Sequence, residues 1–527
     1  MREQFDVLVE NLAQEFGHDI ISSSVARNEL KLEVRKDTFP VIAAHIKKNH
    51  HVQLISEHAV DLREKDGSFH IYLIFSLPKE DHFVTIRTRI DASDPTFRSI
   101  TPEIYAANWF EREIMEGFGI VPVGHPDPRP IRLYDDWPSG TYPMRKDFDL
   151  SSHVPRTPSG YEYRKVEGEG VFEVPVGPVH AGVIEPGHFR FSVAGESILH
   201  LEIRMGYVHK GLEKLSESMR YDHGVFLAER ISGDNGFTHS LAYCQAIESI
   251  AGIGVPDRAR FLRTVYSEME RIYNLFGDIG GIAMDVAFSV GAQNLYLLKE
   301  RALSLNEKAT GSRLLRSVNR IGGVNKDIDA DMKKKISTEL VGIKLDFDDV
   351  VETLTGMASL LDRVETTGTL PTDAAKNFNV VGPIARASGI DRDVRRDHPY
   401  AAYDEVSFSV PSYREGDVYA RMMVKIEEVL ESISIIEQAM DRMPQGPLFT
   451  EAAEVPEGNV GMSLTETHRG EAMHWVLSGN GMPYRHKVRD ASFLNWPAIE
   501  QAVLGNIIPD FPLVNKSFNL SYSGNDL

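Results

Sequence analysis

The stretch ERISGDNGFTHS, residues 229–240, places polar side chains at the spacing of a metal-ligand loop. That loop has the pattern R-x-C-G-x-C-x-x-x-H, and Arg230 and His239 occupy its arginine and histidine positions. Ser232 and Asn235 stand where the two cysteines would be. The stretch is therefore open to three interpretations: a redox site, the remains of one, or the ordinary start of a helix.

Cysteine is scarce, because Cys244 is the single cysteine of the chain. An iron–sulfur cluster usually takes four thiolates, and a structural zinc usually takes at least two Cys or His ligands in register. The chain can form no internal disulfide, and by itself it is expected to hold no conventional cluster. Cys244 lies five residues past His239 on the same predicted helix, where it is expected to fill core space.

Composition narrows the class of protein. Hydrophobic residues make up 42% and charged residues 25%, as in globular proteins that do not enter a membrane. No run approaches the roughly 18 apolar residues of a membrane span. The first residues, MREQFDVLVENLAQEF, predict an amphipathic acidic helix and lack the features of a signal peptide, so we expect a cytoplasmic protein. The formal net charge of −20 would repel a phosphate backbone, which argues against nucleic acid as a partner.

The sequence around the polar loop divides into two parts that differ in their pattern of hydrophobic and polar residues. Residues 1–150 mix short helices with the alternating stretches FHIYLIFSL and FVTIRTRID, which predict strands. Residues 151–170 are polar and turn-rich and predict a linker, and from 171 to 527 helical patterns dominate, with small sheets near both ends. The main predicted helices are 210–230, 236–252, 256–278, 290–320, 325–340, 345–365 and 415–442.

Several motifs together resemble one protein family. GPVHAGVIEPGHFRF, YVHKGLEKL, ARASGIDRDVRRDHPY and TETHRGEAMHWVLSGNG resemble the large subunit of membrane-bound, energy-converting nickel–iron hydrogenases and the related 49-kDa subunit of respiratory complex I. WFEREIMEGFGI, GHPDPRPIRLYDDW and YPMRKDF resemble the 30-kDa subunit of complex I. The two parts are fused in this order in formate hydrogenlyase large subunits. The resemblance implies an α+β domain at 1–150, a linker at 151–170, and a mainly α-helical domain with small β-sheets at 171–527.

The departures from the hydrogenase pattern decide what the resemblance implies about metal. In the hydrogenases, a second cysteine pair lies in a C-terminal D-P-C-x-x-C motif. Here the tail reads NLSYSG, which puts Ser521 and Gly524 at the cysteine positions. Together with Ser232 and Asn235, all four thiolate positions are lost. Neutral side chains do not replace soft, anionic ligands, so we predict neither a nickel–iron centre nor hydrogenase activity.

The resemblance also implies candidate catalytic residues. The segment from Glu185 to His188 matches an E-x-G-H stretch at the hydrogenase site, where the glutamate is thought to relay protons; in complex I this region supplies a histidine to the quinone headgroup. Tyr221 lies nine residues before Arg230, the spacing of the quinone-binding tyrosine of the 49-kDa subunit. Reduction of a quinone needs two proton donors, and histidine and tyrosine are suitable. Asp234 adds an ionisable group to the emptied loop.

Two further residues are expected to line the pocket. His239 matches a histidine that supports the metal site of the family through hydrogen bonds, and Arg469 in THRGE matches an arginine that lies over the diatomic ligands of the iron. Both also have a purely structural interpretation, as a core histidine and as a carboxylate partner.

The candidate catalytic residues have structural interpretations too. His188 could hydrogen-bond a turn, and Tyr221 could be a core tyrosine whose hydroxyl is satisfied. Asp234 and Asn235 lie between two glycines and could form a turn followed by a helix N-cap.

Two functional hypotheses follow from the resemblance. The first is a peripheral-arm subunit of a complex-I-like oxidoreductase on the inner face of the cell membrane, docked on a small subunit with a 4Fe–4S cluster and on hydrophobic, ion-translocating membrane subunits. Electrons from that cluster would reach a quinone-like acceptor in the emptied cavity, and HKGLEKL (209–215) would contact the small subunit. The second is a catalytically silent scaffold that couples a redox or transport module to the membrane subunits. A cavity lined by His188 and Tyr221 favours the first, and one plugged by Phe518 or Tyr522 favours the second.

Overall fold

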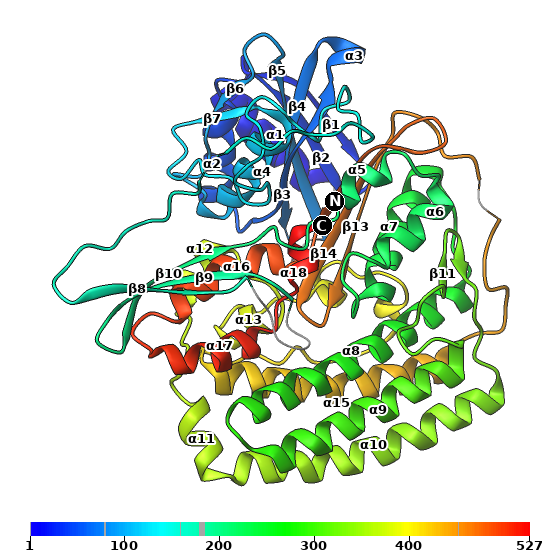
Figure 1. Ribbon diagram of the computed structural model, residues 1–527. Coiled ribbons are helices and arrows are strands. Elements are labelled where there is room, and N and C mark those ends of the chain that lie inside the picture. The colour runs from blue at the N-terminus through cyan, green and yellow to red at the C-terminus, as the bar shows by residue number, and fades with distance from the viewer. Residues whose placement is uncertain (1, 78–80, 159, 179–184, 452) are drawn as a thin grey trace. The chain divides into compact units, whose positions relative to one another are not determined.

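A computed structural model of the chain describes residues 2–77, 81–158, 160–178, 185–451 and 453–527 (Figure 1). The chain divides into two compact units. The first holds Met1–Arg164 and the short segments Arg204–Tyr207 and Asn377–Asn379. The second holds Lys165–Ile203, Val208–Lys376 and Val380–Leu527, and it contains every candidate site residue.

The first unit is built on a five-stranded sheet of order β1-β2-β5-β4-β3. β2 runs parallel to β5, and the other neighbours are antiparallel. FHIYLIFSL and FVTIRTRID form the adjacent strands β4 and β5, which confirms both predicted strands. The elements of this unit are α1 (Arg2–Phe16), β1 (Ile20–Ala26), β2 (Glu29–Val34), α2 (Phe39–Asn49), β3 (Gln53–Leu62), α3 (Arg63–Asp66), β4 (Ser68–Leu77), β5 (His82–Asp91), β6 (Thr96–Arg98), α4 (Asn108–Phe118) and β7 (Val121–Val123).

The second unit is mainly helical. Its long helices α8 (Asp257–Asp285), α9 (Ser289–Thr310), α10 (Ala330–Gly356) and α15 (Val418–Arg442) lie side by side (Figure 1). α7 (Gly236–Ala251), α8 and α15 confirm the helices predicted at 236–252, 256–278 and 415–442. The α+β class of the first unit and the helical character of the second are thus as predicted.

Four predicted helices differ in extent. The segment 210–230 is broken into α5 (Leu212–Ser216) and α6 (Tyr221–Ala228). The helix predicted at 290–320 ends at Thr310, because Gly311 takes a left-handed conformation with φ of 82°. The break predicted between 340 and 345 does not exist, since buried apolar residues keep helical spacing through α10, which is followed by α11 (Ala358–Val364).

Small sheets and short helices complete the second unit. One sheet has the order β10-β9-β8 and another the order β13-β14-β15. Cys244 is fully buried in an apolar cluster on α7, as predicted. The remaining elements are β8 (Val171–Val176), β9 (His188–Ala194), β10 (Ser197–Arg204), β11 (Asn319–Arg320), β12 (Gly323–Val324), α12 (Thr372–Phe378), α13 (Gly382–Ala387), α14 (Val394–Asp397), β13 (Val460–Thr467), β14 (Gly470–Ser478), β15 (Pro483–Arg489), α16 (Ala491–Ala502), α17 (Phe511–Phe518) and α18 (Tyr522–Asp526).

A buried network of ion pairs crosses the middle of the second unit. Arg386 donates from Nε to Glu428 Oε1 at 2.9 Å and from Nη1 to Glu466 Oε1 at 3.0 Å. Arg395 pairs with both carboxylate oxygens of Asp393, at 2.9 and 2.7 Å. These side chains are at most 2% exposed, so charge is held in the interior by opposite charge.

Candidate functional site

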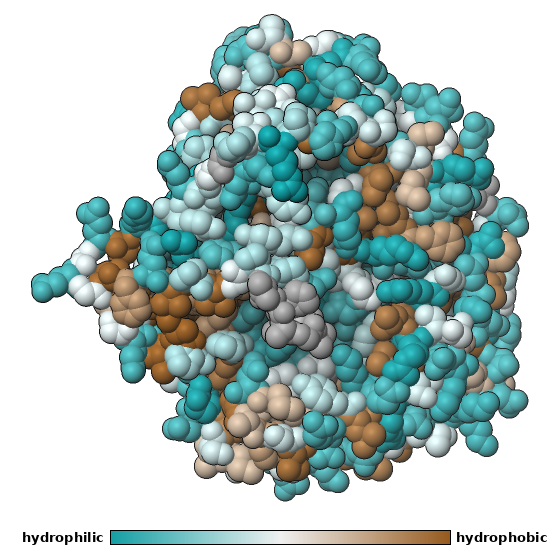
Figure 2. Space-filling view, in the orientation of Figure 1, coloured by the Kyte–Doolittle hydropathy of each residue, from teal (hydrophilic) through white to brown (hydrophobic). Residues whose placement is uncertain are grey.

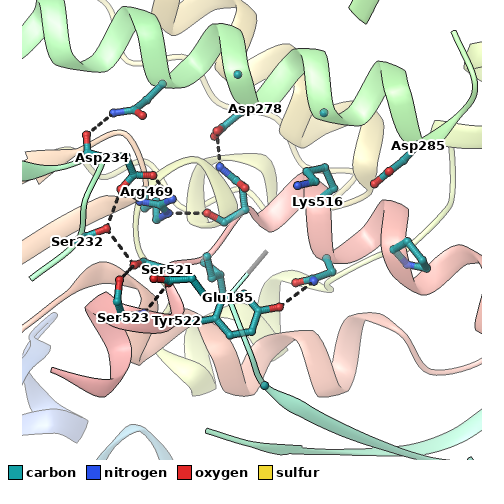
Figure 3. A pocket seen from close by; sticks show the side chains of 18 of the residues that line it. Glu185, Ser232, Asp234, Asp278, Asp285, Arg469, Lys516, Ser521, Tyr522 and Ser523 are labelled. Carbon is teal, nitrogen blue, oxygen red and sulfur yellow. Dashed lines mark hydrogen bonds and ion pairs between the residues drawn. The ribbon is translucent and has the colours of Figure 1, made fainter. Parts of the chain in front are cut away.

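A cavity of about 650 Å³ lies in the second unit (Figure 3). α8 and α17 form part of its wall, and the loop 232–234 and the tail segment 519–523 form another part. Glu185 and Arg469 also face it. The cavity therefore lies where the two emptied cysteine motifs meet.

The four positions that carry cysteine in the hydrogenase pattern converge beside this cavity. The hydroxyl oxygens of Ser232 and Ser521 are 2.9 Å apart, although the residues are 289 positions apart in the chain. The backbone N–H of Gly524 donates to Ser521 Oγ at 2.8 Å, and that of Asn235 donates to the carbonyl of Ser232 at 3.2 Å. The two motifs are thus brought together in space through Ser232 and Ser521.

The residues at these positions do not fit a nickel–iron centre. They offer two hydroxyls bonded to each other and a buried amide whose Oδ1 accepts a hydrogen bond from His468 Nδ1 at 2.8 Å. At the fourth position, a Cβ on Gly524 would lie 2.8 Å from Asp490 Cγ and 2.9 Å from Asp490 Oδ2. The space of a fourth cysteine is therefore filled by a carboxylate, and no soft anionic donor remains at the four positions.

An ion pair ties the emptied loop to the strand hairpin. Arg469 donates to both carboxylate oxygens of Asp234, at 2.9 and 2.6 Å, and its Nε donates to the carbonyl of Asn519 at 2.5 Å. Loss of hydration acts to raise the pKa of Asp234, but the Arg469 guanidinium outweighs it and holds the pKa well below its ordinary value. Asp234 is thus a fixed anion in the cavity wall, and Arg469 has the carboxylate-pairing role named above as its structural interpretation.

Glu185 lines the cavity on the side of the tail (Figure 3). Its Oε2 accepts a hydrogen bond from the backbone N–H of Ser523 at 2.9 Å. The neighbouring Tyr522 also lines the cavity, its hydroxyl 3.4 Å from Asn515 Nδ2, and burial raises its pKa to about 12. A carboxyl group and a phenol therefore face the same space.

Neither aromatic residue of the tail fills the cavity. Tyr522 packs in the wall against Trp496, with ring centroids 4.8 Å apart. Phe518 is buried, and the Arg421 guanidinium lies 4.5 Å from its ring centroid. The plug that would have favoured the scaffold is not formed by these two side chains.

Three candidates do not appear among the described residues that line the cavity: His188, Tyr221 and His239. His188 begins β9, and its Nδ1 lies 3.2 Å from the carbonyl oxygen of Gly177. The hydroxyl of Tyr221 donates to the carbonyls of Gly479 and Met482, at 3.0 and 2.9 Å, in the β14–β15 turn.

His239 is fully buried on α7. Its Nδ1 lies 3.1 Å from His474 Nε2, and its Nε2 lies 3.0 Å from Asp490 Oδ2. It is therefore linked to the emptied cluster through Asp490, the carboxylate beside Gly524.

The cavity is also lined by polar and charged side chains that the sequence motifs did not indicate. Asn274, Asp278 and Asp285 face it from α8, and Lys516 faces it from α17 (Figure 3). Lys425 Nζ donates to Asp278 at 2.6 Å. The signal was present in the sequence, because the three α8 residues recur at steps of four and seven and thus share one helix face.

Comparison with known proteins places this chain in a family. Residues 285–457 and 447–526 match the family "Respiratory-chain NADH dehydrogenase, 49 Kd subunit", and residues 32–154 match the corresponding 30 Kd subunit family. The chain thus joins the two subunit types of one respiratory enzyme class. It belongs to the family of fused 30-kDa/49-kDa subunits that includes the C/D fusions of NADH-quinone oxidoreductase and formate hydrogenlyase subunits.

Individual relatives agree with this assignment. Formate hydrogenlyase subunit 5 of Escherichia coli K12 is 34% identical over 473 residues, 88% of this chain and 83% of the relative. The C/D fusion of NADH-quinone oxidoreductase from Bacteroides thetaiotaomicron is 32% identical over 455 residues, 81% of this chain and 84% of the relative. One protein in the structure of the membrane-bound sulfane sulfur reductase, an archaeal respiratory membrane complex, superposes with a TM-score of 0.65 at 27% identity. That match covers 68% of this chain and 99% of the other.

Proposed function

We propose that this chain is the peripheral subunit of a membrane-bound, complex-I-like oxidoreductase and passes electrons to an organic acceptor in the cavity. The electrons would come from a 4Fe–4S cluster on a small partner subunit, and other partners would be ion-translocating membrane subunits. The acceptor we propose is quinone-like, and no hydrogen chemistry is involved. The chain would act from the cytoplasmic face of the membrane and bind no metal itself.

One observation carries this proposal. The cysteine positions have become a neutral cluster of hydroxyls and an amide, yet a cavity of about 650 Å³ remains open beside it. This volume lies within the range of roughly 300–1,000 Å³ of small-molecule sites. A site that had lost all function would be expected to close around larger apolar side chains.

The cavity wall can support reduction of a carbonyl acceptor. Lys299 and Lys516 supply positive charge, which would stabilise the negative charge that grows on a quinone oxygen as electrons arrive. Glu185 and Tyr522 carry groups that can move a proton. Two electrons and two protons convert a quinone to its hydroquinone, so both kinds of group are needed.

Membrane association is expected through partners. No helix among the described segments is long and apolar enough to cross a bilayer. Apolar side chains gather on the surface over β8–β10 (Figure 2), where Phe172, Val176 and Leu199 are exposed. Exposed apolar groups of this kind support a docking role for the strand sheet.

The scaffold remains the second candidate, because one specific observation favours it. His188 and Tyr221, the donors expected from the resemblance, are not among the described cavity-lining residues, and Tyr221 bonds backbone carbonyls. A protein that has lost its donors could still couple partner modules mechanically.

Filling the cavity separates the two candidates. Gly233 is an exposed residue of the cavity wall, and a Cβ added there would meet no atom within 4 Å, so Gly233→Leu places an apolar side chain at the mouth of the cavity. The matched control is Gly254→Leu at an exposed position that also has nothing within 4 Å. In the purified complex, we expect Gly233→Leu to abolish reduction of a short-chain quinone and Gly254→Leu to leave it unchanged. Equal turnover in both variants would establish the scaffold.

The same preparation tests the acceptor class and the metal content. Elemental analysis should find iron from the small subunit and no stoichiometric nickel, and about one nickel per chain would refute the proposal. Polysulfide is supplied to the complex as an alternative electron acceptor, because the archaeal relative is named a sulfane sulfur reductase. Reduction of polysulfide but not of quinone would replace the acceptor that we propose.

A further inference from the structure

Three histidines form an unbroken hydrogen-bonded line through the interior of the second unit. Asp490 Oδ2 lies 3.0 Å from His239 Nε2, and His239 Nδ1 lies 3.1 Å from His474 Nε2. His474 Nδ1 lies 3.0 Å from His486 Nε2, and His486 Nδ1 lies 2.9 Å from Ser216 Oγ. All five side chains are at most 3% exposed. The line joins α7, β14, β15 and α5, elements distant in the sequence.

The carboxylate at one end sets the direction of every hydrogen bond in this line. Burial acts to raise the pKa of Asp490, but the hydrogen bond from His239, the side chain of Ser492 and the nearby Arg469 guanidinium outweigh it and lower the pKa, so the group is ionised and only accepts. His239 must then carry its proton on Nε2, and its Nδ1 must accept. A neutral imidazole has one donor and one acceptor, so His474 and His486 follow with Nε2–H donors.

His474 and His486 are held neutral by their surroundings. Burial lowers the pKa of His486 to about 3, with Glu213 opposing the shift and Arg485 and Lys487 adding to it. Burial also holds the pKa of His474 well below its ordinary value. A row of neutral imidazoles can pass a proton along without any ring staying positively charged. Each ring accepts a proton on Nδ1 while it gives up the proton on Nε2.

The inner end of the line reaches the emptied cluster. A Cβ at Gly524 would lie 2.9 Å from Asp490 Oδ2 and equally 2.9 Å from Ser521 Oγ, so carboxylate and hydroxyl flank one position. Ser521 lines the cavity. The line therefore ends beside the cavity wall.

The outer end lies on α5. Ser216 is the last residue of that helix and directly follows Leu215, which is exposed. Leu215 also ends the HKGLEKL segment, expected from the resemblance to face the small subunit. The line thus runs from the neighbourhood of a proposed interface toward the proposed acceptor site.

We propose that Ser216, His486, His474, His239 and Asp490 form a proton relay that feeds the cavity from the α5 side. One proton enters on His486 Nδ1, and the Nε2 proton of each ring passes to the next nitrogen. The last passes from His239 to Asp490, which becomes a neutral acid beside Ser521, and Ser521 in the cavity wall would complete the path to the reduced acceptor. The net result is one proton taken up at α5 and one delivered at the cavity. Each ring is left with its proton on Nδ1 and must turn over to regain the Nε2–H tautomer before the next proton passes. The relay rests on the proposed function, because that function supplies the consumer of the protons.

The polarity of the line can be tested without any turnover. In the full chain labelled with ¹⁵N-histidine, single His→Gln variants assign the signals of the three rings. We expect all three to be neutral Nε2–H tautomers at pH 7. An Nδ1–H tautomer or a doubly protonated ring at any of the three positions would overturn the relay, even where a variant folds poorly.

Conduction is tested in the assembled complex. His474→Gln keeps a polar side chain that can donate and accept, but an amide does not pass a proton on. Tyr243→Phe is the matched control, because its buried ring lies 5.1 Å from that of His486 and its hydroxyl is outside the line. We expect His474→Gln to lower quinone reduction by about 10²-fold, His474→Ala to regain activity with added imidazole, and Tyr243→Phe to match the parent.

The outcomes separate the relay from the function on which it rests. A parent complex that reduces quinone, with His474→Gln equally active, overturns the relay alone. A parent complex that reduces no acceptor, with the three rings in the expected tautomers, overturns the proposed function while the polarity of the line stands.

Discussion

The second unit contains two buried polar regions that differ in how they are held. The emptied cluster of Ser232, Asn235, Ser521 and Gly524 carries no formal charge and is joined by ordinary hydrogen bonds. The ion network around Arg386 places arginines and carboxylates together at almost no exposure. One region has exchanged all its ligand side chains for neutral groups, whereas the other keeps every charge paired.

This difference determines how readily each region tolerates amino-acid substitution. A neutral hydrogen bond contributes on the order of 1 kcal/mol, so a hydroxyl cluster tolerates replacement one residue at a time. A buried charge cannot lose its partner without leaving an uncompensated ion, which costs about 3–5 kcal/mol. Side chains of the neutral cluster can therefore be exchanged one at a time while the surrounding charged framework stays fixed.

The largest effect is expected from breaking the charged region. Arg386→Met leaves Glu428 and Glu466 facing an apolar side chain, and we expect the free energy of unfolding to fall by about 3–5 kcal/mol, measured by urea unfolding. Arg396→Met is the control, because that arginine is 40% exposed and its partner Asp391 is 65% exposed. It should cost at most about 1 kcal/mol. An equal fall in the free energy of unfolding for both variants would show that the buried ion pairs contribute no more to stability than the exposed one.

A buried carboxyl between the two regions should make stability depend on pH. Glu270 accepts hydrogen bonds from the N–H groups of Phe237 and Thr238, yet burial without a paired cation raises its pKa from 4.5 to about 8. The folded state then keeps a proton that the unfolded state has lost. Its contribution is fully present below pH 4.5 and is lost as pH rises toward 8, by up to about 1.4 kcal/mol per pH unit. Glu270→Gln should flatten this slope in urea unfolding between those values, and an unchanged slope would exclude Glu270 as its source.

The neutral cluster should respond weakly. Ser232→Ala removes the hydrogen bonds to Asp234 Oδ1, at 2.7 Å, and to Ser521 Oγ. Asp234 keeps both bonds from Arg469, so we expect a loss of only about 1 kcal/mol in the free energy of unfolding. A loss as large as that of Arg386→Met would contradict the contrast between the two regions.

Helical periodicity and strand alternation, which are local patterns, predicted the two-part fold, whereas only the family resemblance implied that the four cysteine positions share one site. The sequence did not predict that Asp490 fills the space at Gly524, since the two residues meet only through tertiary packing. The histidine line was equally invisible, because its members lie on four separate elements and no motif spacing joins His474 to His239. The placement of Tyr221 against the β14–β15 turn depends on how α6 packs, which periodicity alone does not determine.

The smallest effect is expected at Tyr221, where the two interpretations of a motif residue differ most. Tyr221→Phe removes a hydroxyl that donates to the carbonyls of Gly479 and Met482, so stability should fall by about 1 kcal/mol. Because the hydroxyl is engaged with the turn, we expect quinone reduction by the complex to be unchanged. Tyr522→Phe is the matched variant, since that hydroxyl faces the cavity, and there we expect turnover to fall. A proton donor to the acceptor would lose about 10²–10⁴-fold in rate on the same change. A loss of that size at Tyr221, with normal assembly, would move the acceptor site away from the cavity described above and toward α6.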